Sequence, residues 1–327
     1  MVATCNTLNL ANAGRPYYPN QAAYGAAEYE RKIDWLGERF RALNADVLAV
    51  QEVWDEAAFK AALGRSRLHY HSVSVPGAEN GPGGGGALGT PRVGMAARVD
   101  VERLQSFTDL PAELAVEVPG LGHHTRFERP PLLATVRLRH GQRVHVLTCH
   151  LKSKRPKFLL DAQGALLEDR DDPKVAARAV LRSLVMRGAE ATALRWIVVD
   201  LLRGTRDPLV VLGDFNDAPH SVTTQLVAAT SEVAYDKGAR DVALFNAYEV
   251  QGPWALKKDV AYSHIHQGQP EVLDQILVSE EFVPGSRFSL GDVRRVDYFN
   301  DHLHEGRDRG RSDHGFVRAL LRLRQPA

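Results

Sequence analysis

The sequence places two carboxyl groups and an amide directly after one strongly apolar segment. Residues 209–212 are uniformly aliphatic and are followed by Gly-Asp-Phe-Asn-Asp at 213–217. Such a run is typical of a buried strand, and polar groups just past its end are held rigidly. Strand alternation directs Asp214 and Asn216 to one side and Phe215 to the other. A carboxylate and an amide there could orient a water or a phosphate, although these residue types also form ordinary turns.

Polar residues recur at or within the ends of five other predicted strands. In chain order they are Asn6 within 2–10, Glu52 after 47–50, His150 after 144–149, Asp274 within 271–279, and Asp313 with His314 before 316–321. Each alone has an ordinary explanation, such as a strand-end amide satisfied by backbone or a carboxylate at the surface rim. The same arrangement at six strands argues for one shared site, which a domain boundary would divide. We therefore expect a single domain over residues 1–327.

Asp274 is an acid within an otherwise apolar segment, EVLDQILVS at 271–279. A buried carboxylate destabilises a fold unless it has a partner, and a histidine is a natural one. We therefore expect Asp274 to lie beside a histidine.

The cations that follow His150 form the one clearly basic cluster: Lys152, Lys154, Arg155 and Lys157. Such a cluster suits a phosphate-bearing substrate. The alternative is a solvated turn whose cations have no role. The whole chain has a net charge of only +1. Any face that binds an anion must therefore be built locally.

The composition is that of a globular chain, with 44% hydrophobic and 25% charged residues. Only Cys5 and Cys149 occur, which is too few for a disulfide framework, and we expect buried free thiols. The sequence has no apolar run of about 18 residues, so we expect no membrane span. Residues 2–10 resemble a strand rather than a signal peptide. A cytoplasmic protein, or a secreted one already processed, is the expectation.

Helices and further strands complete the predicted pattern. Apolar residues at helical spacing predict an amphipathic helix over 28–43. Other helices are expected at 55–63, 174–202 and 221–229, and other strands at 93–99, 132–138 and 262–266. Residues 76–90 are rich in glycine but lack the Gly-Lys-Ser/Thr ending of a nucleotide-binding loop, so they predict a surface insertion. We expect an irregular segment at 99–129 and a loop at 297–311.

Six of these segments together resemble the endonuclease/exonuclease/phosphatase superfamily, which has the DNase I-like fold. They are CNTLNL at 5–10, QEV at 51–53, HLKS at 150–153, GDFND at 213–217, LDQILVS at 273–279 and SDHG at 312–315. They occur in the family's order and cover essentially the full length. The resemblance implies an α/β fold (α+β by some schemes), a four-layer α/β sandwich with two packed, mixed β-sheets flanked by helices.

The resemblance also implies a metal site and a set of catalytic residues. Glu52 resembles the principal magnesium ligand, with Asp313 and Asn6 as further candidates, and oxygen donors suit Mg²⁺ or Mn²⁺. Asp214 resembles the aspartate that orients the water or acts as general base. Candidates for the remaining roles are Asn216 and Lys152 for holding phosphate, His314 with Asp274 for polarising it, and His150 for protonating the leaving oxygen. Which histidine is acid and which is base stays open.

These residues predict a divalent-metal-dependent phosphodiester hydrolase, first of all an endonuclease acting on DNA or RNA. Cations at 152, 154, 155, 157, 307, 309 and 311 could follow a nucleic-acid backbone. The balanced net charge leaves open a phosphatase or phosphodiesterase acting on a small phosphoester, an inositol phosphate or a phospholipid headgroup. A non-catalytic scaffold is disfavoured because every motif acid is present. No obligate protein partner is evident.

Overall fold

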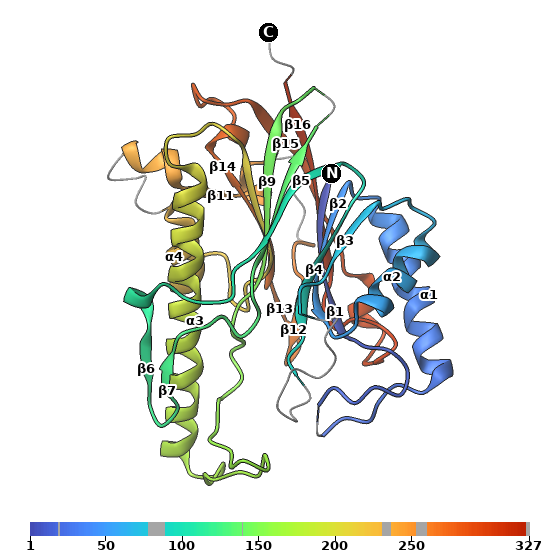
Figure 1. The fold of residues 1–327 in the computed structure, drawn as a ribbon, viewed down its shortest axis with the longest axis vertical. Coiled ribbons are helices and arrows are strands. Elements are labelled where there is room, and N and C mark those ends of the chain that lie inside the picture. The colour runs from blue at the N-terminus through green and yellow to red at the C-terminus, as the bar shows by residue number, and fades with distance from the viewer. Residues whose placement is uncertain (19, 78–88, 139, 231–236, 253–259, 325–327) are drawn as a thin grey trace.

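The computed structural model describes residues 1–327 except 19, 78–88, 139, 231–236, 253–259 and 325–327 (Figure 1). Most of the glycine-rich insertion expected at 76–90 therefore lies outside the described residues. None of the helices in the described part is long and apolar enough to cross a membrane.

Two six-stranded sheets form the centre of the fold. The first has the order β15 (Gly291–Phe299), β16 (Phe316–Leu323), β1 (Val2–Leu10), β2 (Val47–Val53), β4 (Arg92–Ala97), β3 (Ser72–Ser74). The second has the order β11 (Leu244–Asn246), β14 (Asp274–Ser279), β10 (Leu209–Asp214), β9 (Arg143–His150), β8 (Leu132–Arg137), β5 (Asp100–Ser106). Both sheets are mixed, because β1 and β2 pair in parallel, as do β9 and β10, while their other pairs are antiparallel.

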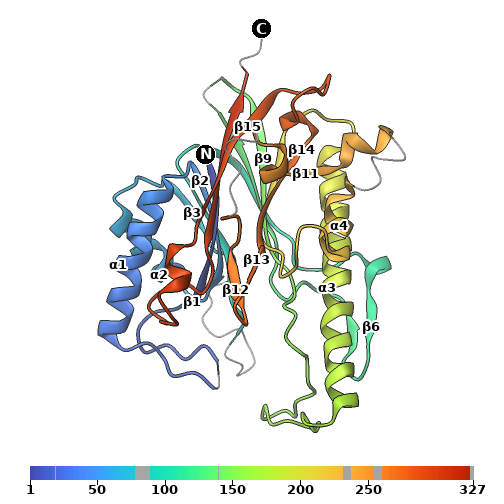
Figure 2. The same ribbon diagram turned by 180° about the vertical axis from the view of Figure 1, so that it is seen from behind.

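Helices cover the outer faces of the two sheets. Figures 1 and 2 show α1 (Ala26–Leu43) and α2 (Glu56–Ser66) on one side and α3 (Pro173–Leu202) on the other. Two shorter helices, α4 (Val222–Ala228) and α5 (Ala247–Val250), and two hairpins complete the fold; the hairpin strands are β6 (Val116–Val118), β7 (Gly122–His124), β12 (His264–His266) and β13 (Gln269–Glu271). The predicted four-layer sandwich is confirmed.

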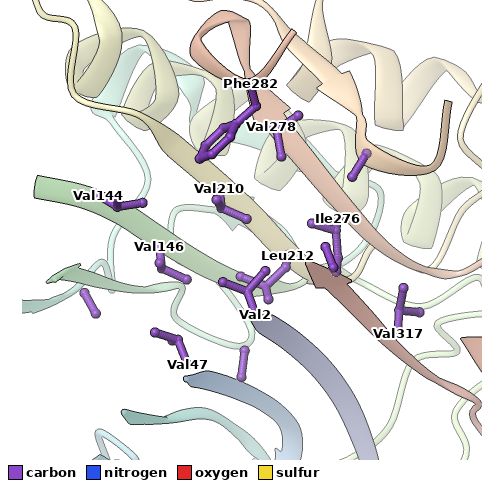
Figure 3. Close-up of a cluster of buried hydrophobic side chains, with 14 of the residues drawn as sticks. Val2, Val47, Val144, Val146, Val210, Leu212, Ile276, Val278, Phe282 and Val317 are labelled. Atoms are coloured by element: carbon purple, nitrogen blue, oxygen red, sulfur yellow. The ribbon is translucent and has the colours of Figure 1, made fainter. Parts of the chain in front are cut away.

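The packing of the core explains why the sequences of the central strands are almost continuously apolar. Between the sheets, valine, leucine and isoleucine side chains interdigitate, among them Val2, Val146, Val210 and Ile276 (Figure 3). The opposite faces of the same strands pack under the helices, as Leu48 does near Phe40 of α1. Strands buried on both faces need apolar residues at every position. Polar residues in them are few, and Thr4, Gln51 and Thr148, which are fully buried, hydrogen-bond to one another between the sheets.

Several strands were not expected from the sequence, and β15 and β5 are the longest of them. β15 occupies residues assigned in part to a loop at 297–311, and β5 begins the segment expected to be irregular at 99–129. Both lie at sheet edges, where charged side chains can face solvent, so their apolar pattern is weak. The other expected strands and helices are present with small shifts in their ends.

Candidate active site

Three neighbouring strands of the second sheet bring His150, Asp214 and Asp274 together. In the strand register Asp214 is opposite His150 on one side and opposite Asp274 on the other. His150 Nε2 lies 3.4 Å from Asp214 Oδ2, and all three residues are buried. Phe215 points the other way into the core, as strand alternation requires.

The first sheet contributes His314 from the loop before β16. Its Nδ1 donates a 2.7 Å hydrogen bond to Asp274 Oδ2. The loop is held in place by Ser312, whose hydroxyl donates to the carbonyl of Asn6 (2.6 Å) and accepts from the His314 backbone N–H (3.0 Å). The ring centroid of His264 from β12 lies 5.1 Å from that of His314. The Asp–His pair therefore joins the two sheets.

The two site histidines differ in their affinity for a proton. Burial lowers the pKa of His314, but the charge and hydrogen bond of Asp274 outweigh it, so its pKa lies well above the usual value. Burial, and then the charge of Arg129, lowers the pKa of His150 well below the usual value. Burial raises the pKa of Asp214 to about 6. Near neutral pH, His314 is a cationic donor and His150 is a neutral imidazole.

Glu52 lies at the end of β2 in an uncommon backbone conformation. Its φ of 61° is in the left-handed region, where a non-glycine residue often marks a functional position. Its carboxylate accepts from the backbone N–H of Asn9 (3.1 Å) and from Asn6 Nδ2 (3.4 Å). The same Asn6 nitrogen donates to Asp214 Oδ2 (3.0 Å), so Asn6 links the carboxylates of both sheets. Asn6 Oδ1 accepts from the backbone N–H of Leu8 (3.1 Å).

Arg129 and Lys152 lie on one side of the site, near the carbonyl of Leu151, and we call this the cationic side. That carbonyl accepts from Asn216 Nδ2 at 2.9 Å and from Arg129 Nη1 at 3.3 Å. Arg129 is only 12% exposed and was not expected from the sequence. No strand-end pattern marks it, because it lies in the connection before β8. Lys152 is also buried, and its Nζ lies 3.9 Å from Glu128 Oε2.

Glu190, in the middle of α3, holds the two segments that carry these cations. Its Oε1 accepts the backbone N–H of Glu128 (2.9 Å), and its Oε2 accepts that of Lys152 (2.8 Å). Arg187, one turn earlier, donates to the carbonyl of Lys152 (3.3 Å). Charges in a long helix usually face solvent, so no sequence pattern marks Glu190 for this role. The helix thus sets the position of the cationic side.

The sequence matches the model of the Endonuclease/Exonuclease/phosphatase family over residues 7–314. The chain belongs to this family. Its members are phosphoester hydrolases and generally use a divalent metal ion. Phosphoester hydrolysis is therefore the reaction that this site serves. No curated protein matches the sequence.

Solved structures of the family share the fold along nearly all of the chain. Mannosyl-6-phosphatase Bt3783 of Bacteroides thetaiotaomicron VPI-5482 has 15% identity and a TM-score of 0.58, covering 98% of this chain and 99% of that one. The human Nocturnin catalytic domain with bound sulfate anion has 17% identity and a TM-score of 0.59, with 99% and 94% covered. D. rerio TDP2 complexed with single-strand DNA product has 14% identity and a TM-score of 0.53, with 98% of each chain covered.

The donors in this family member fit a divalent metal ion. Burial, and then the charge of Asp313, raises the pKa of Glu52, so the two acids repel each other. A cation between them would relieve that repulsion, and carboxylate oxygens are the ligands that Mg²⁺ and Mn²⁺ prefer. Donor atoms of Asp214, Asp274 and His314 also lie within 4.8 Å of one another. There, however, Asp274 holds His314 in its cationic form, and only a neutral imidazole binds a metal ion, so Glu52 and Asp313 are the candidate pair.

Several cations expected at the rim already have acidic partners. Lys154 Nζ lies 3.4 Å from Asp217 Oδ1, and Lys157 Nζ lies 3.2 Å from Glu128 Oε1. Arg309 pairs with Glu28, and Arg311 pairs with Glu305 and Asp308. The rim of this hydrolase is therefore less positive than the sequence suggested.

Proposed function

We propose that this family member is a divalent-metal-dependent phosphodiesterase that cleaves nucleic acid. The observation that carries the proposal is a pair of histidines near Asp214, of which His314 has a raised pKa and His150 a lowered pKa. Cleavage of a phosphodiester needs a base for the attacking water and an acid for the leaving oxygen. Charged His314 can supply the acid, and Asp214 can supply the base, with the neutral ring of His150 3.4 Å from its carboxylate.

Each residue has a role that follows from its surroundings. Charged His314, fixed by Asp274, donates from Nε2 to a phosphate oxygen. Asp214, as a carboxylate above pH 6, orients the attacking water and draws its proton. Asn216 and Arg129, anchored on one carbonyl, bind the remaining phosphate oxygens together with Lys152. A Mg²⁺ or Mn²⁺ ion held by Glu52 and Asp313, with Asn6 adjacent, would supply neutralisation of the phosphate charge.

Nucleic acid is supported as substrate by the sequence pattern and by the likeness to TDP2, which was solved with a single-strand DNA product. A second candidate is a small phosphoester. It is favoured by the ion pairs of Lys154, Lys157, Arg309 and Arg311, since paired cations contribute little to binding along a backbone. The likeness to a mannosyl-6-phosphatase supports the same candidate.

A cleavage panel tests the proposal. Supercoiled plasmid, linear duplex, single-stranded DNA and RNA are incubated with Mg²⁺, Mn²⁺ or EDTA, using the wild type, Asp214→Asn and His314→Ala. Asp200→Asn, a change at an exposed acid near the C-terminal end of α3, serves as the control. We expect metal-dependent cutting by the wild type and the control only. Absence of cutting with every nucleic acid, together with release of phosphate from sugar or inositol phosphates, would replace this proposal by the second candidate.

A further inference from the structure

The β12–β13 hairpin lies next to the Asp274–His314 pair and carries a third histidine of the site, His264. Figures 1 and 2 show the hairpin between the two sheets, toward the end of the fold that lies opposite the N-terminus. The ring centroid of His264 lies 5.1 Å from that of His314, and the two rings are tilted by 44°. His264 is therefore close enough to meet a substrate whose phosphate is bound by His314.

Ser263 fixes the base of the hairpin to both members of that pair. Its hydroxyl accepts from the backbone N–H groups of Leu273 (3.0 Å) and Asp274 (2.8 Å). Its carbonyl accepts from the backbone N–H of Gly315, the residue that follows His314 (2.7 Å). The hairpin is therefore held at a defined position relative to the two residues that align the site.

The face of the hairpin that carries His264 is polar throughout. In the strand register His264 is opposite Glu271, and His266 is opposite Gln269. Residues directly opposite each other lie on the same face of a sheet. No lysine or arginine occurs in residues 262–273. This face can therefore form hydrogen bonds, but it offers no lysine or arginine to a phosphate.

His264 and Glu271 form an acid–imidazole pair that is not closed by a hydrogen bond. Nδ1 of His264 is buried without a hydrogen-bond partner among the described residues, and Glu271 Oε2 lies 4.0 Å from it. Burial lowers the pKa of His264, and the charge of His314 lowers it further, although nearby acids oppose the shift. The ring is therefore neutral at neutral pH. With Nδ1 turned toward Glu271, the acceptor nitrogen that a bound molecule can use is Nε2.

Building on the nucleic-acid cleavage proposed for this site, we propose that the hairpin face binds hydroxyl groups of the sugar that carries the scissile phosphate. His264 Nε2 accepts from one hydroxyl, and the carboxylate of Glu271, which is 35% exposed, accepts from a neighbouring one. A carboxylate binds the hydroxyl of a ribose in the same way in dinucleotide-binding folds. A second phosphate does not suit this face, because Glu271 repels it. An acyl chain does not suit it either, because the polar atoms would stay unpaired.

The substrate class that follows is RNA, in which every sugar carries a 2′-hydroxyl, rather than DNA. A site that hydrogen-bonds a hydroxyl discriminates strongly against an analogue without it, because its own polar atoms are then left unpaired. We therefore expect the wild type to cleave single-stranded RNA with a kcat/KM at least about tenfold above that for DNA of the same sequence. Small sugar phosphates present the same hydroxyl chemistry and form a second arm of the test.

Matched RNA and DNA oligonucleotides test the inference in two variants of the hairpin. His264→Phe keeps a ring against His314 but has no nitrogen, and Glu271→Gln removes the carboxylate. Each should bring the RNA-to-DNA ratio of kcat/KM close to one by slowing the cleavage of RNA. A merely structural role would slow both substrates equally and leave the ratio unchanged. The control is His69→Ala, a change at an exposed histidine in the connection between α2 and β3.

Phosphate release from ribose 5-phosphate and from pentyl phosphate, which lacks the hydroxyls, separates this inference from the proposed function. If neither nucleic acid is cut, the proposed function fails. A preference for ribose 5-phosphate that both hairpin variants lose would then still support the role of the hairpin. Where nucleic acid is cut, an RNA-to-DNA ratio near one in the wild type, or one that both variants leave unchanged, overturns the inference. Where it is not cut, equal rates on the two phosphomonoesters, no release from either, or a preference that the variants keep, overturn it.

Discussion

His314 and Asp274 belong to different sheets, yet His314 Nδ1 lies 2.7 Å from Asp274 Oδ2. Asp274 begins β14 of the second sheet, and His314 precedes β16 of the first. Both residues are buried, so neither charge has water as an alternative partner. The bond therefore sets the proton affinity of His314 and also aligns the two halves of the site.

Asp274 and His314 should act as one unit in catalysis. Asp274→Asn removes the charge that keeps His314 cationic, and we expect kcat to fall by about 10²–10⁴. His314→Ala should cost a similar factor. Because the two residues share one function, the double variant should be no slower than His314→Ala. Multiplicative losses in steady-state kinetics would show that the two act independently.

The lowered pKa of Lys152 predicts that substrate binding depends on pH. Burial lowers the pKa of Lys152 to about 8, so its ammonium group is charged at neutral pH and loses its charge as the pH rises through that value. We expect KM to rise by about tenfold between pH 7 and pH 9. Lys152→Arg, which stays charged throughout, should flatten this rise. Identical KM profiles for the two proteins would show that Lys152 does not bind the substrate.

Glu190 is predicted to position the cationic side without touching substrate. Glu190→Gln keeps one acceptor oxygen but turns an amide group toward the second backbone N–H. We expect KM to rise by about tenfold with a smaller change in kcat, and stability to fall by about 1–3 kcal/mol. Glu280→Gln is the matched control, because Glu280 is buried and accepts from Arg240 (2.9 Å) far from the site. The control should lose stability and keep its KM. An unchanged KM in Glu190→Gln would leave Glu190 a purely structural role.

Residues within strands could be placed from the sequence because their rules are local. Strand alternation separates Asp214 from Phe215, and the cost of a buried carboxylate predicts that Asp274 lies beside a histidine. The two cysteines, next to polar site residues in sequence, are buried and free as expected. The four-layer fold follows from the same apolar runs together with the family resemblance.

Arg129 and Glu190 could not be placed in this way. Arg129 lies in a connection, and its position depends on the carbonyl of Leu151, which is distant in sequence. In the sequence, Glu190 cannot be told from a solvent-exposed acid of a long helix. Its role is visible only in the fold, where its carboxylate accepts the backbone N–H groups of residues 128 and 152. The ion pairs that neutralise the rim cations are likewise tertiary contacts. These features arise only when separate elements meet.

We expect Glu52 to lower the stability of the metal-free protein and to be required for metal binding. Its pKa is raised by burial and by Asp313, so its charged form destabilises the metal-free fold at neutral pH. Glu52→Gln should therefore raise the melting temperature in EDTA. Mn²⁺ should stabilise the wild type but not the variant, since only the carboxylate binds the ion strongly. Equal stabilisation of both proteins by Mn²⁺ would place the metal elsewhere.

The most direct test of the account is the hydrolysis of bis(4-nitrophenyl) phosphate, a diester that requires no nucleic-acid recognition. The rate is measured for the wild type, Glu52→Gln and Asp214→Asn with Mg²⁺, Mn²⁺ or EDTA. We predict metal-dependent release of nitrophenol by the wild type and a loss of about 10²-fold or more in each variant. A wild-type rate that is unaffected by EDTA, or by both substitutions, would contradict the account.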